Sequence, residues 1–141
     1  MKKEVNSNNV NQLKNEERQN LLHESISSGS YDVLKYLLSI NINVNAQDNE
    51  GMTPLHYCGL YRSQTATRQL LENRSIEINK KDDYGNNPLW TAVFNARGNY
   101  DVVKLLKEHG ADQNSKNNKN MSPLDFCKEI EDKNMETILL L

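Results

Sequence analysis

The side chains best able to do chemistry in this chain of 141 residues are its histidines and cysteines. His56 and Cys58 stand two positions apart, whereas His23 and Cys127 lie far from them in the sequence. Imidazole and thiolate groups bind zinc, and a thiol beside a histidine can act as a nucleophile with its own base. The two cysteines nevertheless lack the short paired spacing of a zinc site and form no secreted-type disulfide framework.

Carboxylates are numerous, but none of them forms a catalytic pattern. Glu16 and Glu17 are expected to open a helix, and Glu129, Glu131 and Asp132 are expected to be solvated. The sequence has no glycine-rich phosphate loop, no nucleophile elbow and no metal-ligand motif. We therefore predict that the protein is not an enzyme and that it holds neither a cofactor nor a metal ion.

A four-residue pattern recurs along the chain at an almost constant interval. Its copies start at residues 20, 53, 87 and 122, and their sequences are NLLH, TPLH, NPLW and SPLD. Asn, Thr and Ser are good N-cap residues, and Pro is favoured at the first helical position. Each copy is therefore predicted to start a helix, although the first copy lacks the proline.

A second apolar stripe follows each of these helix starts. It is clearest at residues 33–38 and 102–106, where apolar side chains recur with the spacing of an amphipathic helix. Gly or Asn and a short extended run come next, which indicates a helix stop and a turn. Each unit is thus predicted to contain two antiparallel helices, and residues 95–100 lengthen the loop between the helices of the third unit.

This arrangement resembles the ankyrin repeat family, whose unit has about 33 residues and a TPLH helix start. The Asp-x-x-Gly hairpins at residues 48–51 and 82–85 recur at the same period, although the fourth unit has Asn120 in place of the glycine. The resemblance implies an all-α ankyrin-repeat solenoid of about four helix-turn-helix units with β-hairpin loops. We expect a tail or short capping helix at residues 1–14 and a repeat domain at 15–141, with units at about 15–47, 48–81, 82–116 and 117–141.

The repeat register gives the cysteines a structural explanation. Cys58 and Cys127 both lie two residues after the recurring pattern, where the other units have Ser25 and Ala92. This position is therefore predicted to take a small buried side chain. Packed helices are spaced at about 8–10 Å, so two sulfurs two units apart are too distant for a disulfide.

The histidines also occupy equivalent positions, since His23 and His56 each end the recurring pattern. The resemblance implies that they tie a helix start to its loop by a hydrogen bond. Trp90 and Asp125 stand at this position in the other two units, so no uniform histidine chemistry runs along the chain. Trp90 is expected to be buried between units, where its indole N–H needs a partner.

Composition and charge exclude other classes of protein. The formal net charge is −2 with acidic and basic residues interspersed, which disfavours nucleic acid as a partner. Apolar residues make up 36% of the chain, and roughly one residue in seven is Asn, as suits an elongated stack. No run approaches transmembrane length, and polar residues follow Met1 where a secretory signal would be apolar. We therefore expect a cytoplasmic protein without a membrane partner.

The resemblance also implies which positions contact a partner. These are the hairpin tips and the exposed side of the first helix in each unit, which together form a concave face. Aromatic side chains on such a face often dominate binding, so Tyr61, Tyr84 and Phe94 are the expected anchors, unless Phe94 or Leu60 packs on the next unit. The full set is Gln47, Asn49, Glu50, Met52, Leu60, Tyr61, Lys81, Asp83, Tyr84, Asn86, Phe94, Asn95, Lys116, Asn118, Lys119 and Met121.

Two functions remain open at this point, and both are forms of protein binding. The small size and residues 87–95 resemble small bacterial ankyrin proteins, some of which are immunity proteins encoded beside secreted toxins. That resemblance implies a monomer that inhibits a toxin domain, with Glu50 and Asp83 meeting basic residues of the toxin. The alternative is an adaptor or scaffold, or a secreted effector, that binds a cellular protein without catalysis.

Overall fold

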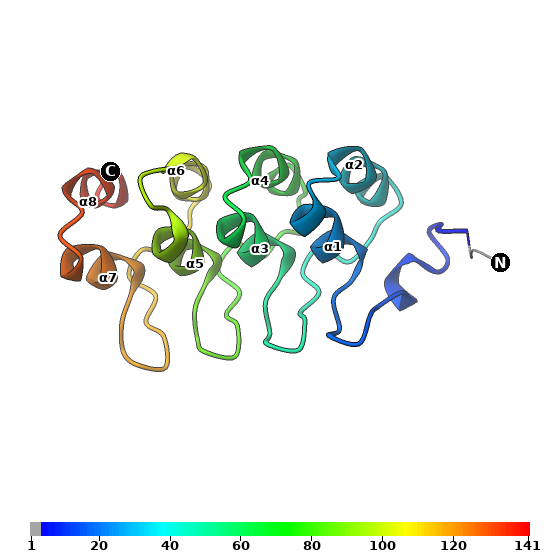
Figure 1. Cartoon of the computed structure of the whole chain (residues 1–141), viewed down its shortest axis with the longest axis horizontal. Coiled ribbons are helices and arrows are strands. Elements are labelled where there is room, and N and C mark those ends of the chain that lie inside the picture. The colour runs from blue at the N-terminus through cyan, green and yellow to red at the C-terminus, as the bar shows by residue number, and fades with distance from the viewer. Residues whose placement is uncertain (1–3) are drawn as a thin grey trace.

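A computed structural model describes residues 4–141 of the protein (Figure 1). One turn of 3-10 helix, η1, precedes eight α-helices that follow one another in four pairs. Within the described residues there is no strand, only an isolated bridge between Lys14 and Asn20. The predicted all-α solenoid of helix pairs is confirmed. The elements are η1 Val10–Gln12, α1 Leu21–Ser28, α2 Tyr31–Ser39, α3 Pro54–Leu60, α4 Gln64–Leu71, α5 Pro88–Asn95, α6 Asp101–Glu108, α7 Pro123–Glu129 and α8 Lys133–Leu139.

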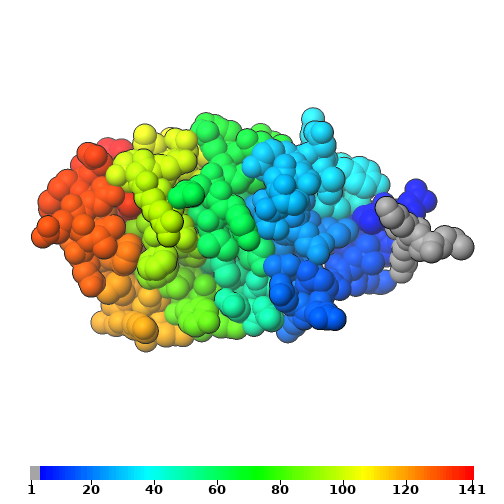
Figure 2. Space-filling model, in the orientation of Figure 1, coloured from blue at the N-terminus to red at the C-terminus, as the bar shows by residue number. Residues whose placement is uncertain are grey.

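The helices form two parallel rows (Figure 1). We call α1, α3, α5 and α7 the inner helices, because they lie between the hairpin loops and the other row, and α2, α4, α6 and α8 the outer helices. Leucines fill the space between the rows, among them the fully buried Leu22, Leu55, Leu70 and Leu106. Figure 2 shows the units as successive bands along an elongated molecule.

Side-chain caps explain where the inner helices begin. The Thr53 hydroxyl accepts from the His56 N–H, and His56 Nδ1 accepts from the Thr53 N–H at 3.1 Å. The first and fourth units have the same reciprocal pair. In the third unit Asn87 accepts from the Trp90 N–H at 2.9 Å, but the indole has no acceptor to return the bond.

All four units contain the same hairpin. Asp48 Oδ1 accepts from the N–H groups of Glu50 and Met52, both at 2.9 Å, and closes a tight turn. Asp82, Asn117 and Asn15 close the other three turns in this way. The fourth residue of each turn has a left-handed φ, which is 62° at Arg18, 76° at Gly51, 78° at Gly85 and 60° at Asn120.

The first hairpin differs from the sequence-based prediction, and the fourth hairpin has a conformation that the sequence left open. The prediction that Glu16 and Glu17 open a helix is wrong, because they lie in the first hairpin and α1 begins only at Leu21. The pattern left the fourth hairpin's conformation open. Asn120 gives it the same shape as the second and third hairpins, because Asn tolerates the left-handed region.

Backbone hydrogen bonds join each hairpin to the next. Asn49 N–H donates to the Glu17 carbonyl at 2.9 Å, and Asp83 N–H donates to the Glu50 carbonyl at 3.0 Å. The close approach explains the glycine at residue 51, because a Cβ there would lie 2.8 Å from the Asp83 nitrogen. Glycine is thus favoured both by the positive φ and by the neighbouring hairpin.

Asparagines form a second set of connections between units. Asn45 accepts from the Glu77 N–H at 2.9 Å and donates to the Ser75 carbonyl at 2.8 Å. Asn79 and Asn11 make equivalent pairs of bonds to the loop of the following unit. Part of the high Asn content therefore serves to align the units.

The segment before the first hairpin takes part in this alignment. Val10 in η1 is fully buried, Val5 packs partly against the core, and Asn11 bonds the loop after α2. Residues 1–3, which belong to the expected tail or capping helix, lie outside the described residues. At the third unit α5 ends at Asn95 and α6 begins at Asp101, which confirms the predicted longer loop.

Candidate functional site

The cysteines are small buried side chains, as the repeat register predicted. Cys58 and Cys127 are both free thiols without solvent exposure. Burial raises the pKa of Cys58 to about 12 and that of Cys127 to about 11. Because the thiolate is the reactive form, both thiols are held in their inert state.

The buried histidines connect one unit to the next. His23 Nε2 donates to the Met52 carbonyl and His56 Nε2 donates to the Asn86 carbonyl, each at 2.8 Å. The Nδ1 atoms accept from the N-cap N–H groups, so both ring nitrogens are used. Burial lowers the pKa of each histidine, which keeps the rings neutral. The expected hydrogen bond to the helix start is present at Nδ1. The bond from Nε2 also connects each histidine to the following hairpin.

Asp125 takes the histidine position in the fourth unit. Its carboxylate accepts from the Ser122 N–H at 2.9 Å and pairs with the Lys116 ammonium. The hydrogen bond from Lys116 and those of Ser122 lower the pKa of Asp125 to about 2. Nearby Asp132 was expected to be solvated, but it is half-buried, caps α8 and accepts from the Tyr100 hydroxyl.

Trp90 takes the same position in the third unit. It was expected to be buried between units, and the structure differs. Its side chain is only half-buried, and its indole N–H is shielded from solvent without an acceptor among the described residues. The ring stacks on Phe94 at a centroid distance of 5.0 Å and lies 5.7 Å from Phe126. The ring is therefore not enclosed between two units as the histidines are, and part of it lies at the surface.

The three expected anchors and Leu60 are about half exposed. The exposed fraction is 59% for Tyr84, 53% for Phe94, 49% for Tyr61 and 40% for Leu60. Phe94 also lies 5.3 Å from Phe126 of the next unit, so it combines exposure with packing across the boundary between units. These side chains lie on one face, formed by the hairpins and the inner helices, which we call the inner face.

Two grooves lie on the inner face. The acidic groove, between the first and second units, has a volume of about 280 Å³, and its lining includes Glu17, Asp48, Glu50, Met52, Leu60 and Tyr61. The aromatic groove, between the third and fourth units, has a volume of about 430 Å³, and its lining includes Tyr84, Trp90, Lys119, Met121, Phe126 and Glu129. Of the other predicted contact residues, Asn49 lines the acidic groove, and Asn86 and Asn118 line the aromatic groove.

The remaining predicted contact residues are used mainly within the protein. Gln47 donates to the Gly51 and Lys81 carbonyls at 2.9 and 3.1 Å. Lys81 donates to the Lys116 carbonyl at 2.8 Å, and Asn95 donates to the Thr91 carbonyl at 2.8 Å. The exposed Asp83 lines neither groove, and its carbonyl accepts from Asn118 at 2.9 Å.

The acidic groove also contains residues that the sequence did not indicate. The Tyr57 hydroxyl donates to Asp48 Oδ2 at 2.6 Å and accepts from the Gln19 amide at 2.7 Å. Burial and the bond to Asp48 raise the pKa of Tyr57. The sequence analysis did not identify Glu17 as a groove residue, because the first hairpin has Arg18 where the second and third have Gly. Asn15 is equivalent to Asp48 and Asp82, and this equivalence could have revealed the first hairpin.

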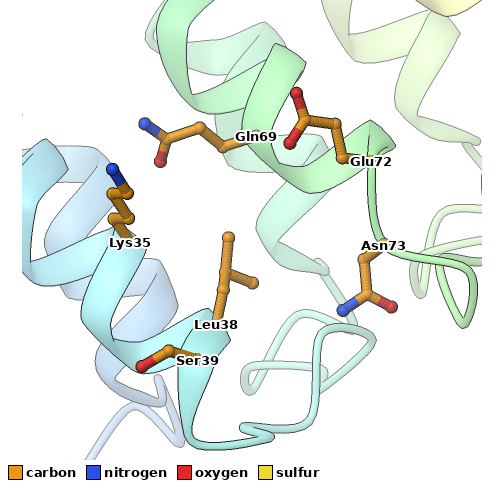
Figure 3. A pocket seen from close by; sticks show the side chains of 6 residues that line it. All are labelled: Lys35, Leu38, Ser39, Gln69, Glu72 and Asn73. Atoms are coloured by element: carbon orange, nitrogen blue, oxygen red, sulfur yellow. The ribbon is translucent and has the colours of Figure 1, made fainter.

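A further hollow of about 520 Å³ lies between outer helices α2 and α4 (Figure 3). Lys35, Leu38 and Ser39 line it from α2, and Gln69 lines it from α4. It includes none of the predicted contact residues.

Two further properties of residues 4–141 bear on other kinds of site. None of the helices there has both the length and the apolar character to cross a membrane. No three His, Cys, Asp or Glu side chains in that part of the chain are grouped so that they could hold a metal ion.

The helix pairs, the shared hairpins and the histidine bridges define a repeat protein whose units are copies of one structural motif. The family described as ankyrin repeats, in three copies, matches residues 2–82 and again residues 43–117. The chain belongs to the ankyrin repeat family. Ankyrin repeats bind other proteins, and proteins built from them are generally non-catalytic interaction modules.

Similar proteins come from distant organisms. A putative ankyrin repeat protein of Rickettsia felis is 33% identical over 109 residues, which is 77% of this chain and 35% of that protein. A homologue of transient receptor potential cation channel subfamily A member 1 in Caenorhabditis elegans is 34% identical over 70% of this chain and 8% of the channel. The Drosophila melanogaster tyrosine-protein kinase Shark is 29% identical over 90% of this chain and 13% of the kinase. The chain thus spans about a third or less of the length of these relatives.

Proposed function

We propose that the chain is a protein-binding module that holds its partner on the inner face and catalyses no reaction. The observation that carries this proposal is the group of exposed aromatic side chains on that face, led by Tyr84 and Phe94. Soluble proteins place aromatic residues at binding surfaces because such residues bury a large area with little loss of conformational entropy. The connected units supply a preorganised surface, which reduces the entropy lost on association.

As the particular function we propose a cytoplasmic immunity protein that acts as a monomer and blocks a cognate bacterial toxin. The acidic groove supports this choice, because Glu17 and Glu50 could meet basic residues that a toxin uses to bind an anionic substrate. Covering such residues would inhibit the toxin without any chemistry by the inhibitor.

The second candidate is an adaptor or an effector that binds a cellular protein. The relatives favour it, since the matched segment is a small part of a kinase and of a channel in two of them. In this case the module would bring a partner close to another protein rather than block an active site.

The test is a tagged pull-down from the native host, followed by a growth assay. A toxin domain retained in stoichiometric amount, which stops growth of cells that lack this protein, would support immunity. Recovery of housekeeping proteins would favour an adaptor, and recovery of a foreign cellular target would favour an effector.

The inner face is tested with the double variant Tyr84→Ala and Phe94→Ala. We expect it to weaken binding of the recovered partner by a few kcal/mol, as for other hot-spot residues, without loss of helical circular dichroism. The matched control is Val33→Ala with Tyr36→Ala on outer helix α2, where both side chains are 49% exposed. Equal losses of affinity in the two double variants would contradict the inner face as the binding surface.

A further inference from the structure

Trp90 lacks the stabilising hydrogen bonds that the histidines make at the equivalent position of the first and second units. The two histidines at the equivalent position each bond the carbonyl of the following hairpin and return the cap bond of their own helix. Trp90 does neither, and its shielded indole N–H has no acceptor within residues 4–141. A shielded donor without a partner destabilises the folded state. The joint between the third and fourth units therefore lacks the histidine bridge that the other two joints have.

What Trp90 supplies instead is a continuous aromatic surface. It stacks on Phe94 with an interplanar angle of 14°, and both rings lie within 6 Å of Phe126 in the next unit. Tyr84 and Met121 complete the apolar part of the groove. A residue that disfavours folding but enlarges an apolar groove is typical of a binding site.

The other groove of the inner face has a different chemistry. Asp48 is committed to its hairpin and to Tyr57. Glu17 and Glu50 are exposed, and neither forms an ion pair with another residue in the described part of the chain. The two carboxylates are therefore available to a cationic side chain of a partner, with Tyr61 and Leu60 beside them.

We infer that the inner face recognises a protein segment with one apolar side chain in the aromatic groove and one arginine or lysine over Glu17 and Glu50. This inference rests on the proposed protein-binding function and names the partner chemistry of the same face. The grooves lie two units apart, or roughly 20 Å if each packed layer adds about 10 Å. An extended segment covers that distance with about six residues, so the two side chains belong to one short segment.

The single tryptophan of the chain allows a direct test. The probes are two acetylated peptide amides, each with one leucine and one arginine separated by five serines, in the two possible orders. We expect one of them to shift the indole ¹H–¹⁵N resonance of Trp90 in a saturable manner. The control peptides carry alanine in place of leucine or glutamate in place of arginine, and we expect several-fold weaker binding from both.

Variants separate the two grooves. Glu17→Gln with Glu50→Gln is expected to bind the arginine peptide and the glutamate control equally. The leucine of either peptide is still expected to shift the indole resonance of Trp90. Trp90→His is expected to raise the melting temperature, because the histidine restores the bond to the next hairpin. A lower melting temperature for Trp90→His would show that tryptophan stabilises the joint, and would overturn the argument from this residue.

The peptide results decide the rest of the inference. No saturable shift from either leucine–arginine peptide would overturn it, and an equal shift from the glutamate control would overturn the assignment of a basic residue. Neither result would touch the proposed function, which is tested separately by the pull-down and by the affinity of the recovered partner for Tyr84→Ala with Phe94→Ala.

Discussion

Single buried side chains connect neighbouring units of this protein. His23 and His56 are the clearest case, because each uses both ring nitrogens and belongs to two units at once. A protonated ring could not accept the N-cap hydrogen, so the bridge exists only in the neutral form. Burial lowers the pKa of both rings and thereby favours that form.

The pH dependence of stability follows from these histidines. Their pKa is lower in the folded chain than the ordinary value of 6.5, so the unfolded chain binds more protons just below pH 6.5. Stability is therefore complete above pH 6.5 and declines as the pH falls below it, by up to about 1.4 kcal/mol per pH unit for each histidine. Urea unfolding at pH 7.5 and 5.5 measures the loss.

Two controls accompany the pH experiment. The pKa of Asp125 is already near 2, so this carboxylate affects stability only in more acidic solution. The variant His23→Gln with His56→Gln is expected to be less stable at every pH, and its stability is expected to be nearly constant between pH 7.5 and 5.5. A decline of the same size in this variant would show that other groups cause it.

At the scale of the element, the hairpins show how a local turn and a neighbouring unit act together. The left-handed residue is Gly85 in the third hairpin, and a Cβ there would lie 2.8 Å from the Asn118 nitrogen. Gly110 has a similar φ of 90°, but a Cβ at that residue would meet nothing within 4 Å. The two glycines therefore separate the effect of backbone conformation from that of close packing.

Gly→Ala is therefore expected to lower the free energy of unfolding by different amounts at these two positions. Gly110→Ala is expected to lose about 1 kcal/mol of unfolding free energy, because only the left-handed backbone is strained. Gly85→Ala is expected to lose about 2–4 kcal/mol, since overpacking adds to that strain. Urea unfolding of both variants measures the difference, and equal losses would mean that the hairpins can move apart at little cost.

The elements also show what the sequence could predict. Caps, proline and apolar spacing are local, so the helix pairs and two of the hairpins followed from them. The first hairpin escaped notice because Arg18 stands in a conformation that usually indicates Gly. The exposure of Trp90 was not predicted either, because it depends on how a large ring fits against Phe126 of another unit.

At the scale of the whole molecule, the units within residues 4–141 pack on their sequence neighbours (Figure 1). Cooperativity therefore passes along the stack from one boundary to the next. The boundaries are made by distinct connectors, with Asn11 bonding the loop of the first unit and Asn45 bonding the loop of the second.

Cutting one connector is expected to loosen the adjacent units first. Asn11→Ala removes the bonds to the loop after α2, so amide hydrogen exchange in α1 and α2 is expected to accelerate about tenfold for each 1.4 kcal/mol lost. Exchange in α7 and α8 is expected to stay unchanged. The control Asn45→Ala acts at an internal boundary and is expected to accelerate exchange in α3 and α4 as well. Uniform acceleration by Asn11→Ala would indicate a single cooperative unit.

The hairpin-to-hairpin bonds have one more effect on the molecule. The N–H of Asn49, Asp83 and Asn118 each donates to the preceding hairpin, so all three bonds have the same direction. The stack therefore has a direction. The carboxylates of the acidic groove lie toward its N-terminal end, and the rings of the aromatic groove lie toward its C-terminal end. A segment turned end for end would meet different donors, acceptors and charges, so the inner face is able to select the polarity of a bound chain as well as its side chains.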